Sequence, residues 1–321
     1  MPFSRLDRVT TPAAHIGFGL AAVGRPGYLD LDRDLPGQRT VEQLRQRTHE
    51  LLDAAYFQGV RYFDTARSYG RGEEFLAEWL TARPEVQDVV VGSKWGYTYV
   101  ADWAVDAETH EVKDHGAAAL ARQWAESSEL LGPRLDLYQI HSLTPDSPAL
   151  TDTGVHAALG RLAADGMTIG FSTSGPAQAD TIRRALAVEV DGRPLFRTVQ
   201  CTYNVLEPSA GEALAEAHDA GLAVIVKEAL ANGRLAGPAA PAALTAIAGE
   251  CGAEPDAVAL AFVLRRPWAD VVLSGAASVA QLHTNLAAAA VDLDDGQFDR
   301  LTELVEQPEP YWRHRAGLPW H

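Results

Sequence analysis

Short apolar runs rich in β-branched and aromatic residues alternate with longer stretches that have helical spacing of apolar positions. Several of the longer stretches, among them residues 116–132 and 209–221, end on a glycine, which favours the end of a helix. The predicted strands are residues 15–21, 61–65, 88–93, 135–141, 168–173, 198–203, 223–228 and 270–274. Eight strands alternating with helices predict an α/β fold, and specifically a (β/α)8 TIM barrel.

A doubly wound parallel sheet would show the same alternation of strands and helices. The early glycines in GFGLAAVG are Gly17, Gly19 and Gly24, and they do not have the G-x-G-x-x-G spacing of a Rossmann fingerprint. The barrel is therefore the favoured architecture.

The barrel is expected to form one domain over residues 1–321, because no linker is long enough to separate two domains. Loop insertions are predicted at about residues 24–40 and 95–115, and a C-terminal tail from about residue 307. Loops of this length often form lids or binding sites. Their aromatic residues are candidates for substrate contacts: Trp95, Tyr97, Tyr311 and Trp312.

Composition excludes several classes of partner. The net charge is −16, with no run of Lys or Arg that could bind a phosphate backbone, so nucleic acid is not expected as a partner. No apolar run approaches the ~18 residues of a membrane span, and the N-terminal residues do not resemble a secretory signal, so a cytoplasmic location is expected. The two cysteines, Cys201 and Cys251, exclude a disulfide framework.

The segment RYFDTARSYG places Asp64 and Tyr69 five residues apart at the end of the second predicted strand. Lys94 follows the third predicted strand, and His141 ends the fourth. In a barrel, the loops at the carboxyl ends of the strands carry the chemistry, so we expect these four side chains to meet. A tyrosine can donate a proton to a carbonyl if a nearby cation stabilises its phenolate, and a carboxylate can hold that cation.

This spacing resembles the aldo-keto reductase family, whose catalytic residues are Asp, Tyr, Lys and His in this chain order. The resemblance implies that Tyr69 is the proton donor and that Lys94 lowers the pKa of Tyr69 from about 10 toward neutrality. It implies that Asp64 holds Lys94 and that His141 orients the substrate carbonyl. The expected reaction is the interconversion of a carbonyl and an alcohol on a small organic molecule, with NADP(H), or alternatively NAD(H), as the hydride carrier.

The same resemblance implies a set of cofactor contacts. Ser172, Thr173 and Gln200 correspond to family residues that bind the nicotinamide carboxamide. Lys227 stands where the family usually has an aromatic residue that stacks on the nicotinamide ring, so Tyr203 is a candidate replacement. Gly19 and Leu230 are further expected contacts of the cofactor.

The segment SGAASVAQLHTNLAAA resembles the family's loop for the adenosine phosphates. Gly275 and Ala276 suit the approach of backbone amides to a phosphate, and Gln281 and Asn285 correspond to residues at the adenine half. Many members have Lys or Arg in this loop for the 2′-phosphate of NADP, whereas residues 274–290 here contain neither. Arg234, from the preceding loop, is the candidate to bind this 2′-phosphate. NADP(H) is therefore the expectation and NAD(H) the alternative.

Other chemistries have weaker support. No metal site is expected, because His110 and His115 lack the spacing and carboxylate pattern of a zinc motif and are predicted to be surface histidines. No G-x-S-x-G elbow is present for a hydrolase. A non-catalytic, regulatory barrel resembling potassium-channel β subunits stays open as an alternative function. The sequence leaves the oligomeric state open.

Overall fold

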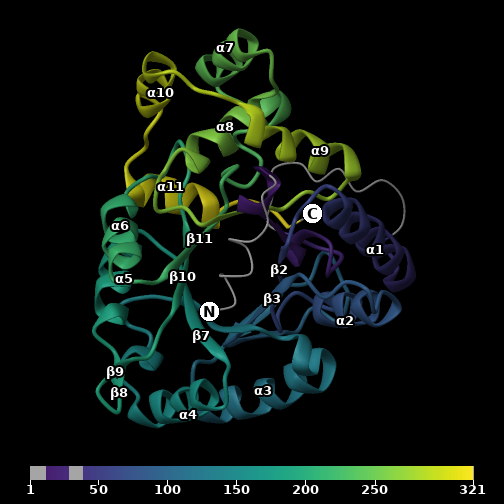
Figure 1. Ribbon diagram of the computed structural model, residues 1–321, viewed down its shortest axis with the longest axis vertical. Coiled ribbons are helices and arrows are strands. Elements are labelled where there is room, and N and C mark those ends of the chain that lie inside the picture. The colour runs from purple at the N-terminus through teal and green to yellow at the C-terminus, as the bar shows by residue number, and fades with distance from the viewer. Residues whose placement is uncertain (1–11, 29–38, 321) are drawn as a thin grey trace.

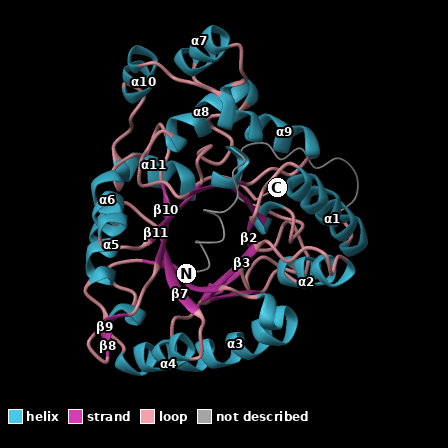
Figure 2. Cartoon of the chain, in the orientation of Figure 1, coloured by secondary structure: helices cyan, strands magenta, loops and turns pink. Residues whose placement is uncertain are grey.

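The computed structural model describes residues 12–28 and 39–320. Within these ranges, eight strands close into a barrel and the helices form an outer layer around it (Figures 1 and 2). The strands are β1 (Ile16–Gly19), β2 (Tyr62–Asp64), β3 (Val90–Trp95), β6 (Leu137–Leu143), β7 (Thr168–Thr173), β10 (Thr198–Thr202), β11 (Ala223–Lys227) and β12 (Val271–Ser274). The predicted (β/α)8 TIM barrel is confirmed, and each predicted strand overlaps an observed one.

All neighbouring strands of the barrel run parallel, in the order β1-β12-β11-β10-β7-β6-β3-β2. The register pairs Gly19 with Asp64 and Lys94 with Gln139. Because parallel strands end at the same edge, the polar residues at the ends of β2, β3 and β6 are brought to one mouth of the barrel.

The helices are α1 (Val41–Phe57), α2 (Gly72–Ala82), α3 (Ala117–Leu131), α4 (Thr153–Ala164), α5 (Gln178–Leu186), α6 (Gly211–Asp219), α7 (Ala242–Cys251), α8 (Pro255–Leu264), α9 (Val279–Ala287), α10 (Asp295–Thr302) and α11 (Pro308–Ala316). Helix α1 begins with a capping box, in which Gln43 N donates to Thr40 Oγ1 (3.3 Å) and Thr40 N donates to Gln43 Oε1 (3.4 Å). Its buried residues include Leu44, Leu51 and Ala55, which share one face toward the barrel.

The predicted middle insertion and the C-terminal tail contain regular secondary structure. The 95–115 stretch, expected to be irregular, contains an antiparallel hairpin of β4 (Tyr97–Tyr99) and β5 (Glu111–Lys113). A second hairpin joins β8 (Glu189–Val190) to β9 (Arg193–Pro194). The tail contains helix α11, and residues 29–38 of the first insertion lie outside the described residues.

Apolar side chains fill the space between the strands and the helices, while a smaller group around Tyr62 fills the barrel interior. A Cβ at Gly92 would lie 2.5 Å from Tyr62 Oη, so a side chain at position 92 would collide with this ring.

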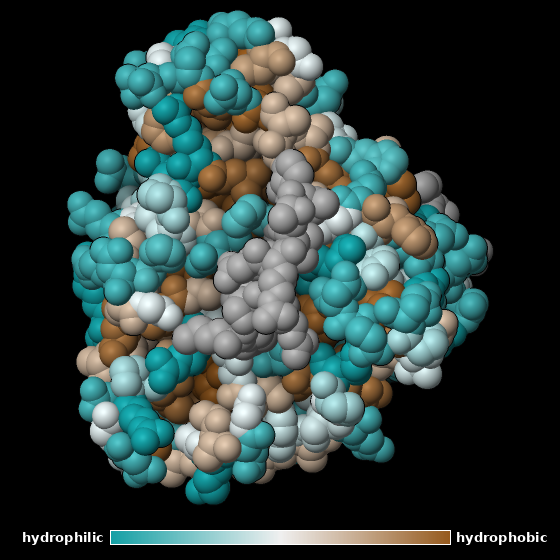
Figure 3. Space-filling view, in the orientation of Figure 1, coloured by the Kyte–Doolittle hydropathy of each residue, from teal (hydrophilic) through white to brown (hydrophobic). Residues whose placement is uncertain are grey.

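On the face shown in Figure 3, hydrophilic side chains cover most of the outer layer. None of the described helices combines the length and the apolar character needed to cross a membrane.

Candidate active site

The four predicted catalytic residues meet at the mouth of the barrel. Lys94 Nζ donates to Asp64 Oδ2, to the carbonyl oxygen of Thr65 (2.9 Å) and to Tyr69 Oη (3.4 Å). The rings of Tyr69 and His141 pack edge to face with their centres 5.5 Å apart. The structure therefore brings these four side chains together as the order of the strands predicted.

Asp64 is held by more than its lysine. Its Oδ1 accepts hydrogen bonds from Tyr62 Oη (3.1 Å) and from Gln200 Nε2 (2.8 Å), which reaches across from β10. Each carboxylate oxygen thus has at least one donor, which a buried charged group requires. The ion pair with Lys94 is fully enclosed, because the side chains of Lys94 and Asp64 are 0% and 2% exposed.

The pKa of Tyr69 differs from the sequence-based expectation. Burial raises it well above 10, the Asp64 carboxylate raises it further, and the Arg25 guanidinium opposes both effects. Burial also lowers the pKa of Lys94, which Asp64 partly offsets. The expectation that Lys94 brings the pKa of Tyr69 toward neutrality is not met in the protein alone, because loss of water outweighs the attraction of nearby cations.

His141 lies among cations. Burial lowers its pKa well below 6.5, and the charges of Lys94, Lys227 and Arg25 lower it further, so its ring is neutral at neutral pH. The next residue, Ser142, has a left-handed backbone (φ 56°), and its N–H donates to Ser172 Oγ (2.8 Å). Ser172 therefore fixes the strand end that carries His141. The left-handed backbone of Ser142 stores a small strain at the site.

One cavity of about 300 Å³ connects this cluster with the loops after β11 and β12. The predicted site residues on its wall are Gly19, Asp64, Tyr69, Tyr97, His141, Gln200, Lys227, Leu230, Gly275, Ala276, Gln281 and Asn285. Lys94 lies directly behind Tyr69. The wall also includes Arg25, Tyr28, Glu111 and Arg315, which the sequence analysis did not select.

The sequence model of the Aldo/keto reductase family matches residues 15–306 of this chain. The chain belongs to this family. "Aldo-keto reductase str7" of Strobilurus tenacellus is 23% identical and is matched over 92% of this chain and 90% of its own length. "Pyridoxal 4-dehydrogenase" of Microbacterium luteolum is 28% identical over 74% and 81%, respectively. The crystal structure of an aldo-keto reductase from Klebsiella pneumoniae in complex with NADPH has the same fold (TM-score 0.67, 23% identity, 92% of this chain and 93% of that one).

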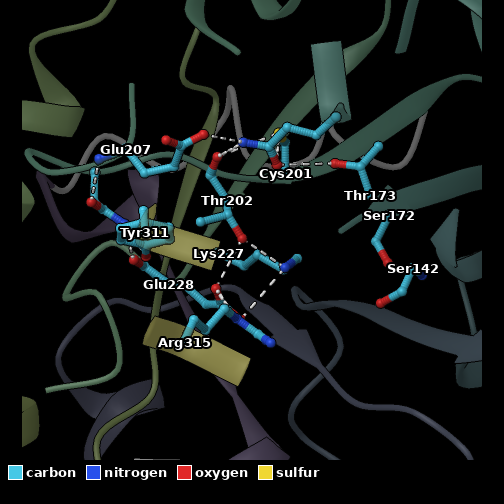
Figure 4. Close-up of polar contacts among 12 residues, drawn as sticks. Ser142, Ser172, Thr173, Cys201, Thr202, Glu207, Lys227, Glu228, Tyr311 and Arg315 are labelled. Atoms are coloured by element: carbon cyan, nitrogen blue, oxygen red, sulfur yellow. Dashed lines mark hydrogen bonds and ion pairs between the residues drawn. The ribbon is translucent and has the colours of Figure 1, made fainter. Parts of the chain in front are cut away.

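In this aldo-keto reductase, a charged network surrounds Lys227 (Figure 4). Lys227 Nζ donates to Thr202 Oγ1 (2.8 Å) and lies 3.6 Å from the Glu228 carboxylate, which also pairs with Arg315 of α11. Burial raises the pKa of Glu228, but Arg315 and Lys227 outweigh burial and lower this pKa to about 2. Lys227 thus lies on the cavity wall at the position where the resemblance implied an aromatic ring.

The end of the cavity formed by the loop after β12 is held by hydrogen bonds within the chain. Gln281 Oε1 accepts from Ala277 N (2.8 Å), and Ser278 caps helix α9 through the N–H of Gln281. With the Asn285 amide oriented to satisfy its neighbours, Ser274 Oγ donates to its oxygen (2.8 Å) and its nitrogen donates to Asp256 Oδ2 (2.9 Å). Asp256 also lines the cavity, so a carboxylate lies at this end of the cavity.

Several predicted contacts do not line the cavity. Tyr203 packs against Trp268 (ring centres 4.9 Å apart) and is 2% exposed, so it is not in position to replace the missing stacking ring. Arg234 pairs with Glu306, and its guanidinium lies over Tyr311 (5.6 Å). Ser172 and Thr173 are fully buried beside the cavity, and Thr173 Oγ1 donates to Gln178 Oε1 (3.5 Å).

The substrate candidates divide in the same way. Tyr97 lines the cavity and packs edge to face on His141 (5.1 Å). Trp95 is 0% exposed in the apolar core, and Tyr311 and Trp312 are the buried residues of α11. The tail reaches the cavity through Arg315 instead.

The histidines of the insertion are buried, so the prediction that they lie on the surface is wrong. His115 Nε2 donates to the carbonyl oxygen of His141 (2.8 Å), and burial lowers the pKa of His115 to about 4, which keeps it neutral. His110 stacks on Trp320 with ring centres 4.0 Å apart. The described residues contain no cluster of three or more His, Cys, Asp or Glu side chains that could bind a metal ion.

Proposed function

We propose that this protein is an NAD(P)(H)-dependent oxidoreductase that interconverts a small carbonyl compound and its alcohol, with Tyr69 as the general acid and base. The observation that supports this role is the position of Tyr69 Oη, on the cavity wall, 3.4 Å from Lys94 Nζ and beside the neutral ring of His141. A proton donor, a cation behind it and a hydrogen-bonding imidazole around one point form an arrangement suited to carbonyl reduction.

In the direction of reduction, Tyr69 donates its proton to the carbonyl oxygen. Its raised pKa keeps the phenol protonated across the neutral range, so the donor is available there. Lys94 then stabilises the phenolate that remains, and Asp64 holds Lys94 in place. His141, neutral over the same range, fixes the carbonyl through a hydrogen bond. In the direction of oxidation, the phenolate accepts the proton, so oxidation is favoured at alkaline pH.

The residues along the cavity suit a nicotinamide dinucleotide, which would supply the hydride. Gly275 has open space where a Cβ would be, so a phosphate can approach the backbone amides that follow β12. Gln200 and Lys227 lie on the wall near the catalytic cluster, where they would hold the carboxamide end. Leu230 and Gly19 complete the wall between the two ends.

The choice between NADP(H) and NAD(H) depends on the adenosine end. NADP(H) is the expectation from the family, but Arg234 is engaged with Glu306 and the described residues place the carboxylate of Asp256 there instead of a cation. A 2′-phosphate near a carboxylate would be repelled, whereas a ribose hydroxyl could donate to it. We therefore propose NAD(H) as a cofactor that competes with NADP(H).

The experiment that tests the function measures consumption of NADH and of NADPH with a panel of aldehydes and ketones, together with fluorescence titration of both cofactors. We expect turnover, and a dissociation constant for NADH no more than about tenfold above that for NADPH, equal to ~1.4 kcal/mol. The panel includes pyridoxal, because one relative is named for it. Cofactor binding without turnover of any carbonyl would favour the regulatory barrel, and a larger preference for NADPH would contradict the role of Asp256.

The insertion hairpin provides a second prediction. Tyr97→Ala should change KM and the order of preferred substrates more than tenfold, because Tyr97 lines the cavity against His141. NAD(P)H affinity should stay close to wild type. Trp95→Ala is the matched control, since it is expected to cost about 3–5 kcal/mol of unfolding free energy as a buried aromatic residue. Equal kinetic effects for the two variants would contradict this division.

A small-molecule partner and a cytoplasmic location stay predictions.

A further inference from the structure

Arg25 lies directly against the proposed proton donor. Its guanidinium carbon is 5.2 Å from the centre of the Tyr69 ring, and its Nη1 donates to Ser68 O (2.9 Å) and to the Glu111 carboxylate (2.5 Å). Arg25 is 3% exposed, although it lines the cavity. The ring of Trp320, from the tail, covers it at 4.9 Å. A buried cation that contacts the tyrosine ring is thus supported by the first insertion, the hairpin and the tail.

The backbone beside Arg25 fixes this contact. A Cβ at Gly24 would lie 2.4 Å from the carbonyl oxygen of Tyr69, so only glycine allows the loop after β1 to approach the turn that carries Tyr69. Arg71 N donates to Gly24 O (2.8 Å) and closes this contact. The position of the guanidinium over the ring is therefore set by backbone packing, and it does not depend on a flexible side chain alone.

Six charged or titratable groups surround Tyr69. They are Asp64 of β2, Lys94 of β3, Glu111 of β5, His141 of β6, Glu228 after β11, and Arg25. Burial, followed by Asp64, raises the pKa of Tyr69; Arg25 lowers it, and Glu111 and Glu228 raise it. Arg25 and Glu111 therefore act on the phenol in opposite directions while they bond to each other.

We infer that Arg25 is a positioning residue for the reaction. It is a second cation at Tyr69, in addition to Lys94, and it stabilises the phenolate, while Glu111 limits the strength of this effect. This inference rests on the proposed role of Tyr69 as acid and base. Because Glu111 belongs to the hairpin and Trp320 to the tail, the segments that shape the substrate end of the cavity also adjust how readily Tyr69 gives up and takes back its proton.

The test compares the pH at which alcohol oxidation reaches half its maximal kcat in three proteins. Arg25→Met should raise this pH by about one unit, because the phenolate loses a charge about 5 Å away, and Glu111→Gln should lower it. Opposite shifts are the decisive sign, since general disorder of the site would move both variants in the same way. Alkaline absorbance titration, with the same variants in a Tyr69→Phe background subtracted, measures the ionisation of Tyr69 without turnover.

Controls separate charge from packing. Arg25→Lys keeps the cation and should stay near the wild-type midpoint, while the double variant Arg25→Met/Glu111→Gln removes both charges and should return close to it. Arg313→Met removes an exposed arginine of the same tail and should have no effect on the midpoint. If Arg25→Met does not fold, Glu111→Gln and Arg25→Lys still test the inference.

Shifts of the two single variants in the same direction, or no shift in either, would overturn the role of Arg25. Normal turnover by Tyr69→Phe would instead overturn the proposed function itself. The two failures are therefore distinguishable.

Discussion

Replacing Tyr69 with phenylalanine is expected to lower kcat by about 10²- to 10⁴-fold, because it keeps the ring and removes only the proton donor. The ring contacts with His141 and Arg25 stay possible, so NAD(P)H affinity and unfolding free energy should remain close to wild type. Steady-state kinetics with the best carbonyl of the panel and a fluorescence titration of the cofactor measure both quantities.

A matched control removes a hydroxyl elsewhere. Tyr56 Oη donates to Asp88 Oδ1 (2.9 Å) in the outer layer, and Tyr56 does not line the cavity. Tyr56→Phe should therefore leave kcat unchanged. Near-normal turnover by Tyr69→Phe would mean that another group supplies the proton, with His141 as the first alternative to examine.

Lys94→Met is expected to have a large effect on stability as well as on activity. Removing one partner of a fully buried ion pair leaves the Asp64 charge uncompensated, which costs about 3–5 kcal/mol of unfolding free energy. Turnover should fall as in Tyr69→Phe, and the pH midpoint of oxidation should rise because the phenolate loses its nearest cation. Denaturant unfolding and the pH dependence of kcat measure these effects.

The double variant Asp64→Asn/Lys94→Met separates the two effects. It removes both charges, so most of the lost stability should return while activity stays low. Recovery of activity along with stability would show that the pair serves only the fold.

The order of strands was sufficient to predict the barrel and the meeting of four polar side chains at its mouth. Asp64, Lys94 and His141 each lie near the carboxyl end of a strand, and parallel strands in a barrel bring such ends together whatever the sequence distance between them. Tyr69 lies at the same mouth because the segment between β2 and α2 is short. The loop after β12 was assigned to the cofactor only through the resemblance to the family, and this assignment stays a proposal.

The alternation of side chains along β3 was a further signal in the sequence, because it predicts which side chains face the barrel interior. Lys94 and Trp95 are consecutive residues of β3, so their side chains point to opposite faces of the barrel wall. If Lys94 faces the interior, Trp95 must face the outer helices, and the structure places it in the core there. Alternation alone would have removed Trp95 from the substrate candidates.

The remaining residues of the wall could not be found from local pattern. Arg25, Glu111 and Arg315 belong to three segments separated by many residues, and none stands in a motif. Their meeting depends on how the insertions fold over the barrel mouth, including a hairpin that the sequence analysis took for irregular chain. The pKa of Tyr69 likewise depends on burial, which is a property of the assembled site.

Tyr62 connects the centre of the barrel to the proposed catalytic cluster. Its ring fills the interior against Gly92, and its hydroxyl donates to the carboxylate that holds Lys94. Redesign of this protein for heat resistance by repacking its interior would therefore disturb Lys94, the proposed partner of Tyr69, through the Asp64 carboxylate. The outer faces of the surrounding helices are the safer place to begin, since changes there leave the support beneath the active site untouched.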